Sequence, residues 1–182
     1  MKRKLEANIM PEIKERYSTN VFSSEPVDPK DLEEILLAGT LAPSAYNGQP
    51  WRFYVITDQA EKEWLAEYML PAEKEWIFNA PVLILLAAYL EDEHNGLYNY
   101  WAGFDSGCAW GYMSLEAQRR GYATHCVGSF DRVDLRSMFQ LGEKIDLYGI
   151  IALGRPGKSE KALFEKSPQR KTVNSVMLRR KE

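Results

Sequence analysis

Residues 41 to 51 read Leu41-Ala42-Pro43-Ser44-Ala45-Tyr46-Asn47-Gly48-Gln49-Pro50-Trp51. This stretch is a polar, turn-rich loop between a helix signal and a strand signal. Pro43 and Pro50 fix their own φ angles and disfavour helical geometry in the residues before them. Asn47-Gly48 is a dipeptide that accepts positive φ in a tight turn. The loop is therefore rigid. It is either an ordinary connector or a fixed set of polar side chains and free backbone N–H groups that hold a planar polar ligand.

The segment before this loop carries the clearest helix start in the chain. Asp28 stands at the N-cap position and Pro29 at the first helical position. The residues that then follow helical spacing are Leu32, Ile35, Leu36 and Gly39. This helix is predicted to pack on the core and to lead directly into the loop.

The rest of the chain alternates between strand and helix patterns. Strands are predicted at 51–57, 81–89, 123–130 and 147–154, and further helices at 7–16, 59–69, 95–120 and 131–139. The run 81–89 is almost continuously apolar, which predicts a strand buried on both faces at the centre of a sheet. The tail from Arg155 onward is charged and has no strong period. Together the patterns predict a layered sheet covered by helices.

Composition narrows the function classes. A length of 182 residues fits one domain, and a net charge of −3 argues against a general nucleic-acid binder. The longest apolar run, 80–90, is too short to cross a bilayer, and no apolar signal region follows the first lysines, so a soluble, cytoplasmic protein without a membrane partner is expected. Cys108 and Cys126 lie far apart without a CxxC motif, which predicts free thiols and no metal site.

Several residues leave a choice between structure and chemistry. His94 and His125 stand near no nucleophile motif and are interpreted as surface or packing histidines. Asp105 can pair across helices, cap a backbone group or face solvent. The middle of the predicted 95–120 helix mixes aromatic with small residues, which indicates close approach of another helix or a ligand. A second copy of the same helix across a dimer axis also fits this pattern.

The segment 152–159 reads Ala152-Leu153-Gly154-Arg155-Pro156-Gly157-Lys158-Ser159 and is a near match to a phosphate-binding P-loop. Alanine replaces its first glycine, and Pro156 removes one of the backbone N–H groups on which such a loop depends. The remaining tail is also too short for the helix and the further strand of a nucleotide triphosphatase. A turn that ends a strand is the preferred interpretation.

Several segments together carry a resemblance to a known family. They are Arg16-Tyr17-Ser18-Thr19-Asn20-Val21-Phe22, Glu25-Pro26-Val27, Ala42-Pro43-Ser44-Ala45-Tyr46-Asn47-Gly48-Gln49-Pro50-Trp51-Arg52-Phe53, Ala80-Pro81-Val82, Asp105, Gly121-Tyr122-Ala123-Thr124 and Ile151-Ala152-Leu153-Gly154-Arg155-Pro156. In this order, and over most of the chain, they resemble the FMN-dependent nitroreductase family. The resemblance implies an α+β fold with a central mixed β-sheet covered by helices, in one FMN-binding domain over residues 1–182. It also implies an intertwined homodimer with the flavin at the interface.

The resemblance also implies a set of cofactor-binding residues. The matching positions are Arg16, Tyr17, Ser18, Asn20, Pro43, Ser44, Ala45, Asn47, Val127, Gly128, Ser129, Arg170 and Lys171. The family positions matched by Arg16 and Ser18 hold the flavin phosphate and ribityl region, and the matches of Arg170 and Lys171 complete the phosphate site. The 43–47 loop runs along the ribityl chain and the ring, and the main chain of 127–129 faces the flavin. A phosphate close to a dianion is well matched by two arginines and a lysine.

The implied activity is that of an FMN oxidoreductase. NADH or NADPH reduces the flavin at N5, leaves, and is replaced by an electron-poor acceptor such as a nitroaromatic, a quinone or an enone. No catalytic side chain is assigned, because the flavin carries the chemistry. The alternatives are a flavin-dependent dehydrogenase or reductive dehalogenase on the same fold, or a non-catalytic module that has lost flavin. The last alternative is suggested by Asn20, where the family often has a basic residue, and by the short length of the chain. If flavin is bound, the short chain leaves its face either open or covered by Tyr98, Tyr100, Trp101 or Trp110.

Overall fold

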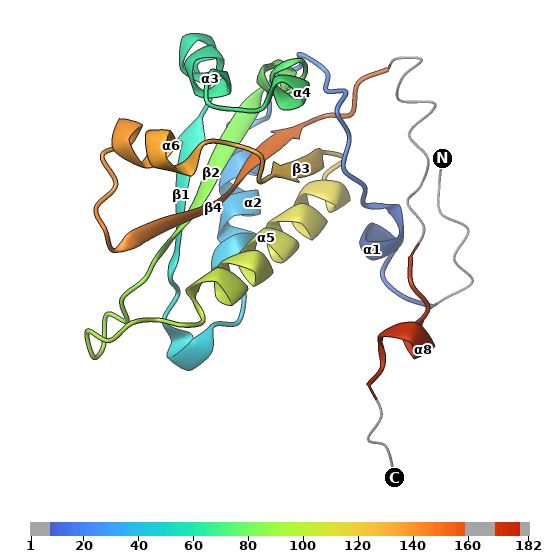
Figure 1. The fold of residues 1–182 in the computed structure, drawn as a ribbon. Helices are drawn as coiled ribbons and strands as arrows, with labels where there is room; N and C mark the ends of the chain where they lie inside the picture. Colours follow the sequence, from blue (N-terminus) through green and yellow to red (C-terminus); the bar gives the residue numbers. More distant parts are fainter. Residues whose placement is uncertain (1–7, 159–169, 179–182) are drawn as a thin grey trace.

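The computed structural model describes residues 8–158 and 170–178 (Figure 1). Within these residues the strands are β1 (Trp51–Ile56), β2 (Val82–Tyr89), β3 (Ala123–Val127) and β4 (Ile145–Gly154). The α-helices are α1 (Pro11–Glu15), α2 (Pro29–Thr40), α3 (Gln59–Ala66), α4 (Pro71–Lys74), α5 (Ala102–Arg119), α6 (Arg132–Met138) and α8 (Val173–Val176). Two 3₁₀ turns, η1 (Ala45–Asn47) and η2 (Ile77–Asn79), complete the set. The predicted α+β class is confirmed.

The strands of the described residues form one sheet in the order β1-β2-β4-β3, with every neighbouring pair antiparallel. The expectation of a mixed sheet is therefore wrong for this part of the chain. The connection from β1 to β2 leaves and re-enters the sheet at the same end, so those strands run in opposite directions. Helix α5 carries the chain back along the sheet, but β4 then inserts between β2 and β3, and no parallel neighbours result.

Strand β2 shows why the sheet carries helices on both faces. Its side chains alternate between two apolar clusters, as the period of two in a strand requires. Val82, Ile84 and Leu86 pack with residues of α2 and α5 on one face. Leu83 and Leu85 pack with residues of α3, η2 and α6 on the other. The prediction of a central strand buried on both faces is confirmed, and its apolar run supplies the middle layer of the core.

Helix α2 begins as predicted. The Asp28 carboxylate accepts hydrogen bonds from the backbone N–H groups of Lys30, at 2.8 Å, and Asp31, at 3.3 Å. Its predicted apolar face contacts the core, and Gly39 is buried there. A Cβ atom at Gly39 would lie 2.7 Å from the Met113 side chain. The glycine therefore permits the close approach of α2 to α5, which brings the loop after α2 to the first turn of α5.

Some predicted boundaries are wrong for local reasons. The long helix starts at Ala102, not at residue 95, because Asx turns occupy the preceding segment: Asp92, Asn95 and Asn99 side chains accept from backbone N–H groups two residues later. Helix α3 ends at Ala66 instead of residue 69. The predicted strand 123–130 ends at Val127, and the predicted helix 7–16 is observed at Pro11–Glu15, with residue 7 outside the described residues. The short helix α8 in the tail was not predicted.

The cysteines and the glycine-rich turn after β4 are structural. Cys108 and Cys126 are free and partly buried, and burial raises the pKa of the Cys126 thiol to about 11. The described part of the turn, 155–158, pairs with the N-terminal segment: Gly157 N–H donates to the Val21 carbonyl at 2.8 Å. Among the described residues, no group of three metal-ligating side chains occurs and no helix could span a membrane.

Candidate functional site

The loop around η1 has an unusual backbone. Tyr46, Asn47 and Gln49 all adopt positive φ, at 51°, 58° and 44°, without being glycine. Left-handed residues of this kind are uncommon outside glycine, and clusters of them occur at ligand-binding and active sites. Tyr46 is 89% exposed. The loop therefore holds a strained conformation while presenting an aromatic ring and polar groups to the surface.

Most backbone donors of this loop are used within the protein. The N–H groups of Asn47 and Gly48 donate to the carbonyls of Ser44 and Ala45, and the N–H of Gln49 donates to Ser44 Oγ at 3.1 Å. These three N–H groups are therefore not available to a ligand, because the tight turn uses them. The Gln49 side-chain amide also donates within the loop, to the Asn47 carbonyl at 3.3 Å. The Asn47 side chain is exposed.

A buried aspartate anchors the loop to α5. Asp105 is 2% exposed, and its Oδ2 accepts a hydrogen bond from the Ala45 N–H at 3.0 Å. It is in the first turn of α5, so the loop is joined to the beginning of that helix. The sequence left three roles open for Asp105. In the structure it caps a backbone group, the Ala45 N–H of the loop. The small neighbours Ala102 and Ser106 are also buried, which lets the loop lie close to the helix.

The segment 16–20 forms a second candidate region. Arg16 and Tyr17 are half-buried, Ser18 and Asn20 are exposed, and Thr19 is fully buried. The carbonyl of Thr19 lies 3.1 Å from His125 Nδ1 on β3. Beyond Thr19, the chain runs along the end of β4, where Phe22 pairs with Pro156. The structure therefore fixes this segment against β3 and β4.

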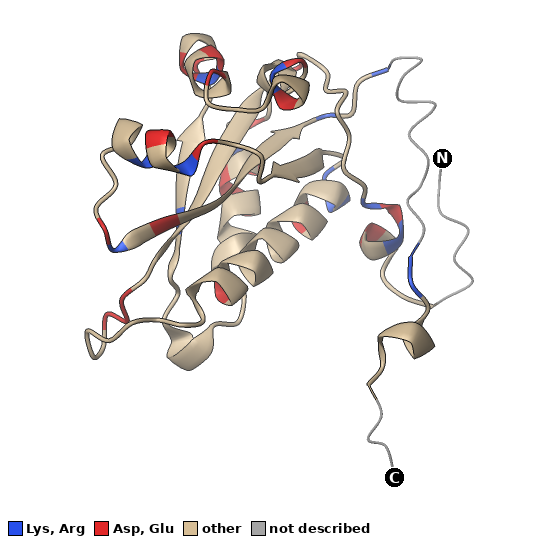
Figure 2. Cartoon of the chain, in the orientation of Figure 1, with Lys and Arg blue, Asp and Glu red and all other residues tan. Residues whose placement is uncertain are grey.

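The remaining predicted residues lie on β3 and in the tail. Val127 is buried, Gly128 is exposed, and the Ser129 carbonyl accepts from the Leu70 N–H at 3.2 Å. A Cβ atom at Gly128 would have no neighbour within 4 Å, so this glycine leaves an open surface. Arg170 and Lys171 are exposed at the start of the 170–178 segment, where Figure 2 shows a basic stretch.

One chain does not bring all these residues together. The η1 loop is tied to the first turn of α5, whereas 16–20 is tied to β3, which follows the other end of that helix. Eighteen residues of α5 span about 27 Å. Figure 1 shows η1 far from both α1 and the 170–178 segment. The predicted cofactor residues therefore form two separate groups within a single copy.

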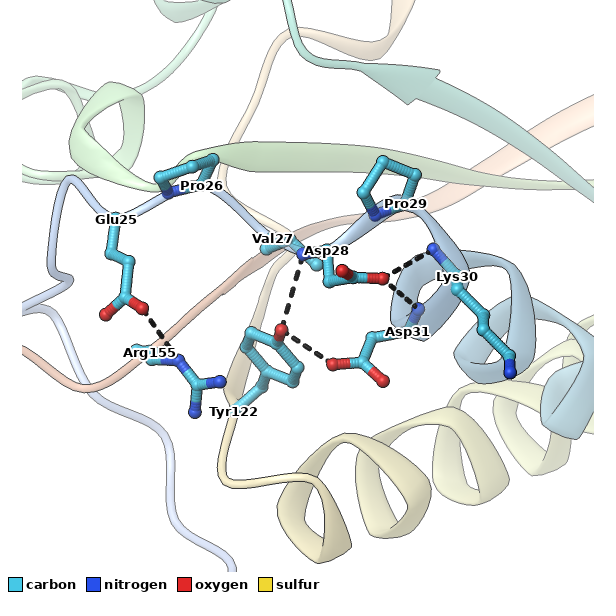
Figure 3. Close-up of a pocket in the computed structure, with 9 residues that line it drawn as sticks. All are labelled: Glu25, Pro26, Val27, Asp28, Pro29, Lys30, Asp31, Tyr122 and Arg155. Carbon is cyan, nitrogen blue, oxygen red and sulfur yellow. Dashed lines mark hydrogen bonds and ion pairs between the residues drawn. The ribbon is translucent and has the colours of Figure 1, made fainter.

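A hollow between the start of α2 and the end of β4 lies outside both groups (Figure 3). The Arg155 guanidinium lies 4.6 Å from the centre of the Tyr122 ring and pairs with Glu25 at 3.4 Å. Tyr122 donates to Asp31 at 2.8 Å, and Arg120 also binds Asp31. Each of these polar groups has a partner in the protein. The residues around the hollow therefore form a corner of paired charges, which joins α2 to α5.

The same corner gives the fold a dependence on pH. The hydrogen bond from Arg120, and then that from Tyr122, lower the pKa of Asp31. The pKa of Glu116 is also lowered, chiefly by its hydrogen bond from Arg119. Groups with a lowered pKa stabilise the folded state above their unfolded pKa, and this contribution is lost as the pH falls through the folded pKa. The corner therefore weakens in acid, below about pH 4.

Comparison with known proteins identifies the fold. The family model described as "Nitroreductase family" matches residues 13–75 and 68–155, which cover most of the chain. The chain belongs to the nitroreductase family. It is 32% identical over 161 residues to a "Putative NADH dehydrogenase/NAD(P)H nitroreductase" of Archaeoglobus fulgidus, a match that covers 82% of this chain and 86% of the relative.

Two further comparisons bear on cofactor and fold. A Bacillus subtilis protein named "FMN reductase [NAD(P)H]" is 29% identical over 136 residues, which are 66% of this chain and 54% of that protein. A crystal structure described as an oxidoreductase containing FMN has a TM-score of 0.85 at 23% identity and covers 97% of this chain and 93% of its own. The predicted family and fold are confirmed. The relatives support the predicted enzyme class, an FMN-dependent oxidoreductase, with FMN and NAD(P)H as cofactors.

Removing the Asp105 carboxylate tests whether the loop needs its anchor. D105A leaves the Ala45 N–H without its acceptor, which we expect to destabilise the protein by about 1–3 kcal/mol. Flavin affinity should fall as well, because the loop loses its fixed conformation. Urea unfolding and a fluorescence titration with FMN measure the two effects. The control is D58A, which removes the N-cap of α3 far from the loop. It should lower stability without lowering the affinity for FMN. Equal losses of FMN affinity in D105A and D58A would argue against an anchoring role for Asp105.

Proposed function

We propose that the protein is an FMN-dependent oxidoreductase that uses NAD(P)H to reduce an electron-poor acceptor, with residues 1–182 as one FMN-binding domain. When bound, FMN would supply the hydride chemistry: its N5 would accept a hydride from NAD(P)H, and the reduced flavin would then be oxidised by a nitroaromatic, quinone or enone in a ping-pong cycle. The observation that carries the proposal is the strained, exposed η1 loop. Strained backbone conformations cluster at ligand-binding sites, and this loop matches the family loop that binds flavin. We also propose that the protein lies in the cytoplasm, where NAD(P)H is available as the electron donor.

The residues present fit FMN in their chemistry. Arg16, with Ser18, would hold the phosphate, and Arg170 and Lys171 would add positive charge to it. Asn20 contributes no charge, so Arg170 and Lys171 would neutralise a larger share of the phosphate charge. The half-buried position of Arg16 lowers the local dielectric around an ion pair and strengthens it relative to one in water.

The flavin ring and ribityl chain need a different surface. The loop from Pro43 to Asn47 would supply an apolar wall together with the Ser44 hydroxyl and the Asn47 amide as hydrogen-bonding groups. The main chain of 127–129, with its exposed glycine, would allow close approach of the ring system. We assign no acid or base to this chain, because protons can come from water or from the flavin.

Two copies of the chain would complete one site. The exposed face of α5 carries Phe104, 68% exposed, and Tyr112, while Gly107 and Gly111 leave open surface on the same side of the helix. Helix α2, which packs on α5, adds the exposed residue Leu37. Exposed apolar side chains gathered on one helix face are typical of an interface. We propose a homodimer in which the η1 loop of one protomer meets the 16–20 segment of its partner.

The direct test is the flavin content and reactivity of the purified protein. We expect a flavin absorbance spectrum, or its appearance when FMN is added, and anaerobic bleaching of that spectrum by NADH or NADPH. Reoxidation by a quinone or a nitroaromatic in a second mixing step would complete the cycle. Failure to bind added FMN would overturn the proposal. Binding without bleaching by either nucleotide would instead favour a flavin dehydrogenase or a dehalogenase that takes electrons from another donor.

A further inference from the structure

Gln49 is the strained residue of the η1 loop that lies nearest to β1 in the chain. Its φ of 44° is left-handed, a conformation that is unfavourable for a residue with a side chain. Its N–H donates to Ser44 Oγ at 3.1 Å, and its side-chain amide donates to the Asn47 carbonyl at 3.3 Å. Both bonds are internal to the loop, so they do not fix the loop to the rest of the protein.

Arg52 supplies a contact between this strained residue and the sheet. Its Nη1 donates to the Gln49 carbonyl at 3.1 Å and to the Trp51 carbonyl at 2.9 Å. The backbone of Arg52 is held in β1, which pairs with β2 and places Arg52 opposite Ala87. The guanidinium therefore ties the carbonyl of the left-handed residue to the edge of a rigid sheet.

The guanidinium is itself held from the side of β2. Its Nη2 pairs with Glu93 Oε1 at 2.6 Å, and its carbon lies 5.1 Å from the centre of the Tyr89 ring. Tyr89 ends β2, and Glu93 follows in the segment that leads to α5. A planar guanidinium can bind several acceptors at once, whereas a lysine ammonium cannot hold this geometry. The direction of the Arg52 side chain is therefore set by groups on both sides of it.

The loop thus has one anchor at each end. Asp105 accepts from the Ala45 N–H at the beginning, and Arg52 donates to the Gln49 carbonyl at the end. Tyr46 and Asn47, which also have positive φ, lie between these two anchors. Strained residues persist only where their surroundings hold them. A loop that is held in this way before binding spares a ligand the cost of ordering it.

We propose that Arg52 is a positioning residue for the flavin and acts by holding Gln49 in its left-handed conformation. This inference rests on the proposed function, which puts the loop from Pro43 to Asn47 along the ribityl chain and the ring. The phosphate is assigned to other residues. Loss of Arg52 should therefore weaken FMN and riboflavin, which has no phosphate, by the same factor.

The first test removes the donors of Arg52. R52M keeps an apolar stem of similar length, and we expect it to weaken FMN and riboflavin about tenfold each. The matched control is R155M. Arg155 also pairs with a glutamate and lies over a tyrosine ring, and its side chain is 39% exposed against 42% for Arg52. It lies outside both groups of predicted flavin residues, so R155M should bind both flavins like the wild type. Flavin fluorescence titrations measure these affinities.

The second test asks whether Arg52 acts through the backbone of Gln49. Q49G and Q49A both remove the side-chain amide, but only glycine accepts positive φ without a steric penalty. Without Arg52, an alanine should leave the left-handed conformation and lower the fraction of protein that is ready to bind. We expect R52M/Q49G to bind flavin about five- to tenfold more tightly than R52M/Q49A. With Arg52 present, Q49G and Q49A should differ by less than about twofold.

Each outcome has a distinct meaning. Three results would overturn the inference while FMN binding by the wild type upholds the proposed function. They are flavin affinity in R52M equal to that in R155M, a loss for FMN but not for riboflavin, and the same difference between Q49G and Q49A with and without Arg52. A wild-type protein that binds neither flavin would overturn the proposed function and the inference with it. Circular dichroism checks folding, and R52K, which keeps the charge but lacks the planar fork, replaces R52M in both tests if R52M does not fold.

Discussion

Replacing Arg16 by alanine is expected to lower the affinity for FMN by about 10- to 100-fold, because charge-assisted hydrogen bonds to phosphate contribute roughly 1.5–3 kcal/mol each. The half-buried position of the guanidinium places the effect toward the upper end of that range. R170A should weaken FMN in the same direction but less, since Arg170 is exposed and its charge is better screened by solvent. Both effects should shrink as salt is added.

Flavin retained through gel filtration, followed by a fluorescence titration of the stripped protein, measures these affinities. The matched control is R119A, which removes an arginine that is exposed on α5 and paired with Glu116. It should bind FMN like the wild type. If R16A keeps its FMN to the same extent as R119A, the assignment of the phosphate to the N-terminal segment is wrong, whatever the activity of the protein proves to be.

Filling the open glycine positions of α5 should separate folding from dimer formation. In one chain a Cβ atom at Gly107 or Gly111 would have no neighbour within 4 Å, so leucine fits at both positions. Leucine also has a higher helix propensity than glycine, by roughly 0.8 kcal/mol per residue. The double variant G107L/G111L is therefore expected to fold at least as stably as a single chain. At a helix interface between two copies, however, the added side chains would keep the backbones apart.

We expect G107L/G111L to elute and scatter light with the mass of one chain, whereas the wild type should have the mass of two. Its FMN affinity should fall by at least about 100-fold, because each copy would retain only one of the two residue groups and about 3 kcal/mol or more of contacts would be lost. The control V133D changes an exposed position on α6, away from this face, and should remain dimeric with flavin. If the double variant remains dimeric and retains flavin, the exposed face of α5 is not part of the dimer interface.

The features that sequence reasoning predicted well depend on neighbours along the chain. The Asp28 cap, the strand at 82–89 and the helix end at Gly121, where φ is +79°, all follow from signals within a few residues. The start of α5 was misplaced for the same kind of reason, since the Asx turns before it compete locally with helix. Local signals thus account for both the correct and the incorrect boundaries.

The candidate site depends on contacts that no local pattern reports. The hydrogen bond from Ala45 to Asp105 joins residues 60 positions apart, and that between His125 and Thr19 joins residues 106 apart. Neither partner has a composition that identifies the other. An aspartate in a first helical turn usually interacts with the helix dipole, and a lone histidine on a strand usually packs in the core. Only packing of α5 and β3 against the loops shows which groups meet.

By itself, the sequence determined the family, the α+β class, the order of the elements and the rigid loop from Pro43 to Pro50, because these follow from motifs, periodicity and turn chemistry that the residues carry locally. The tertiary structure alone decided that the sheet of the described residues is antiparallel throughout and that the loop uses most of its own N–H groups. It also decided that the loop and the 16–20 segment lie at opposite ends of α5. The physical reason is that strand order and the distance between two loops are set by how the layers pack, and packing joins residues that are far apart in the chain.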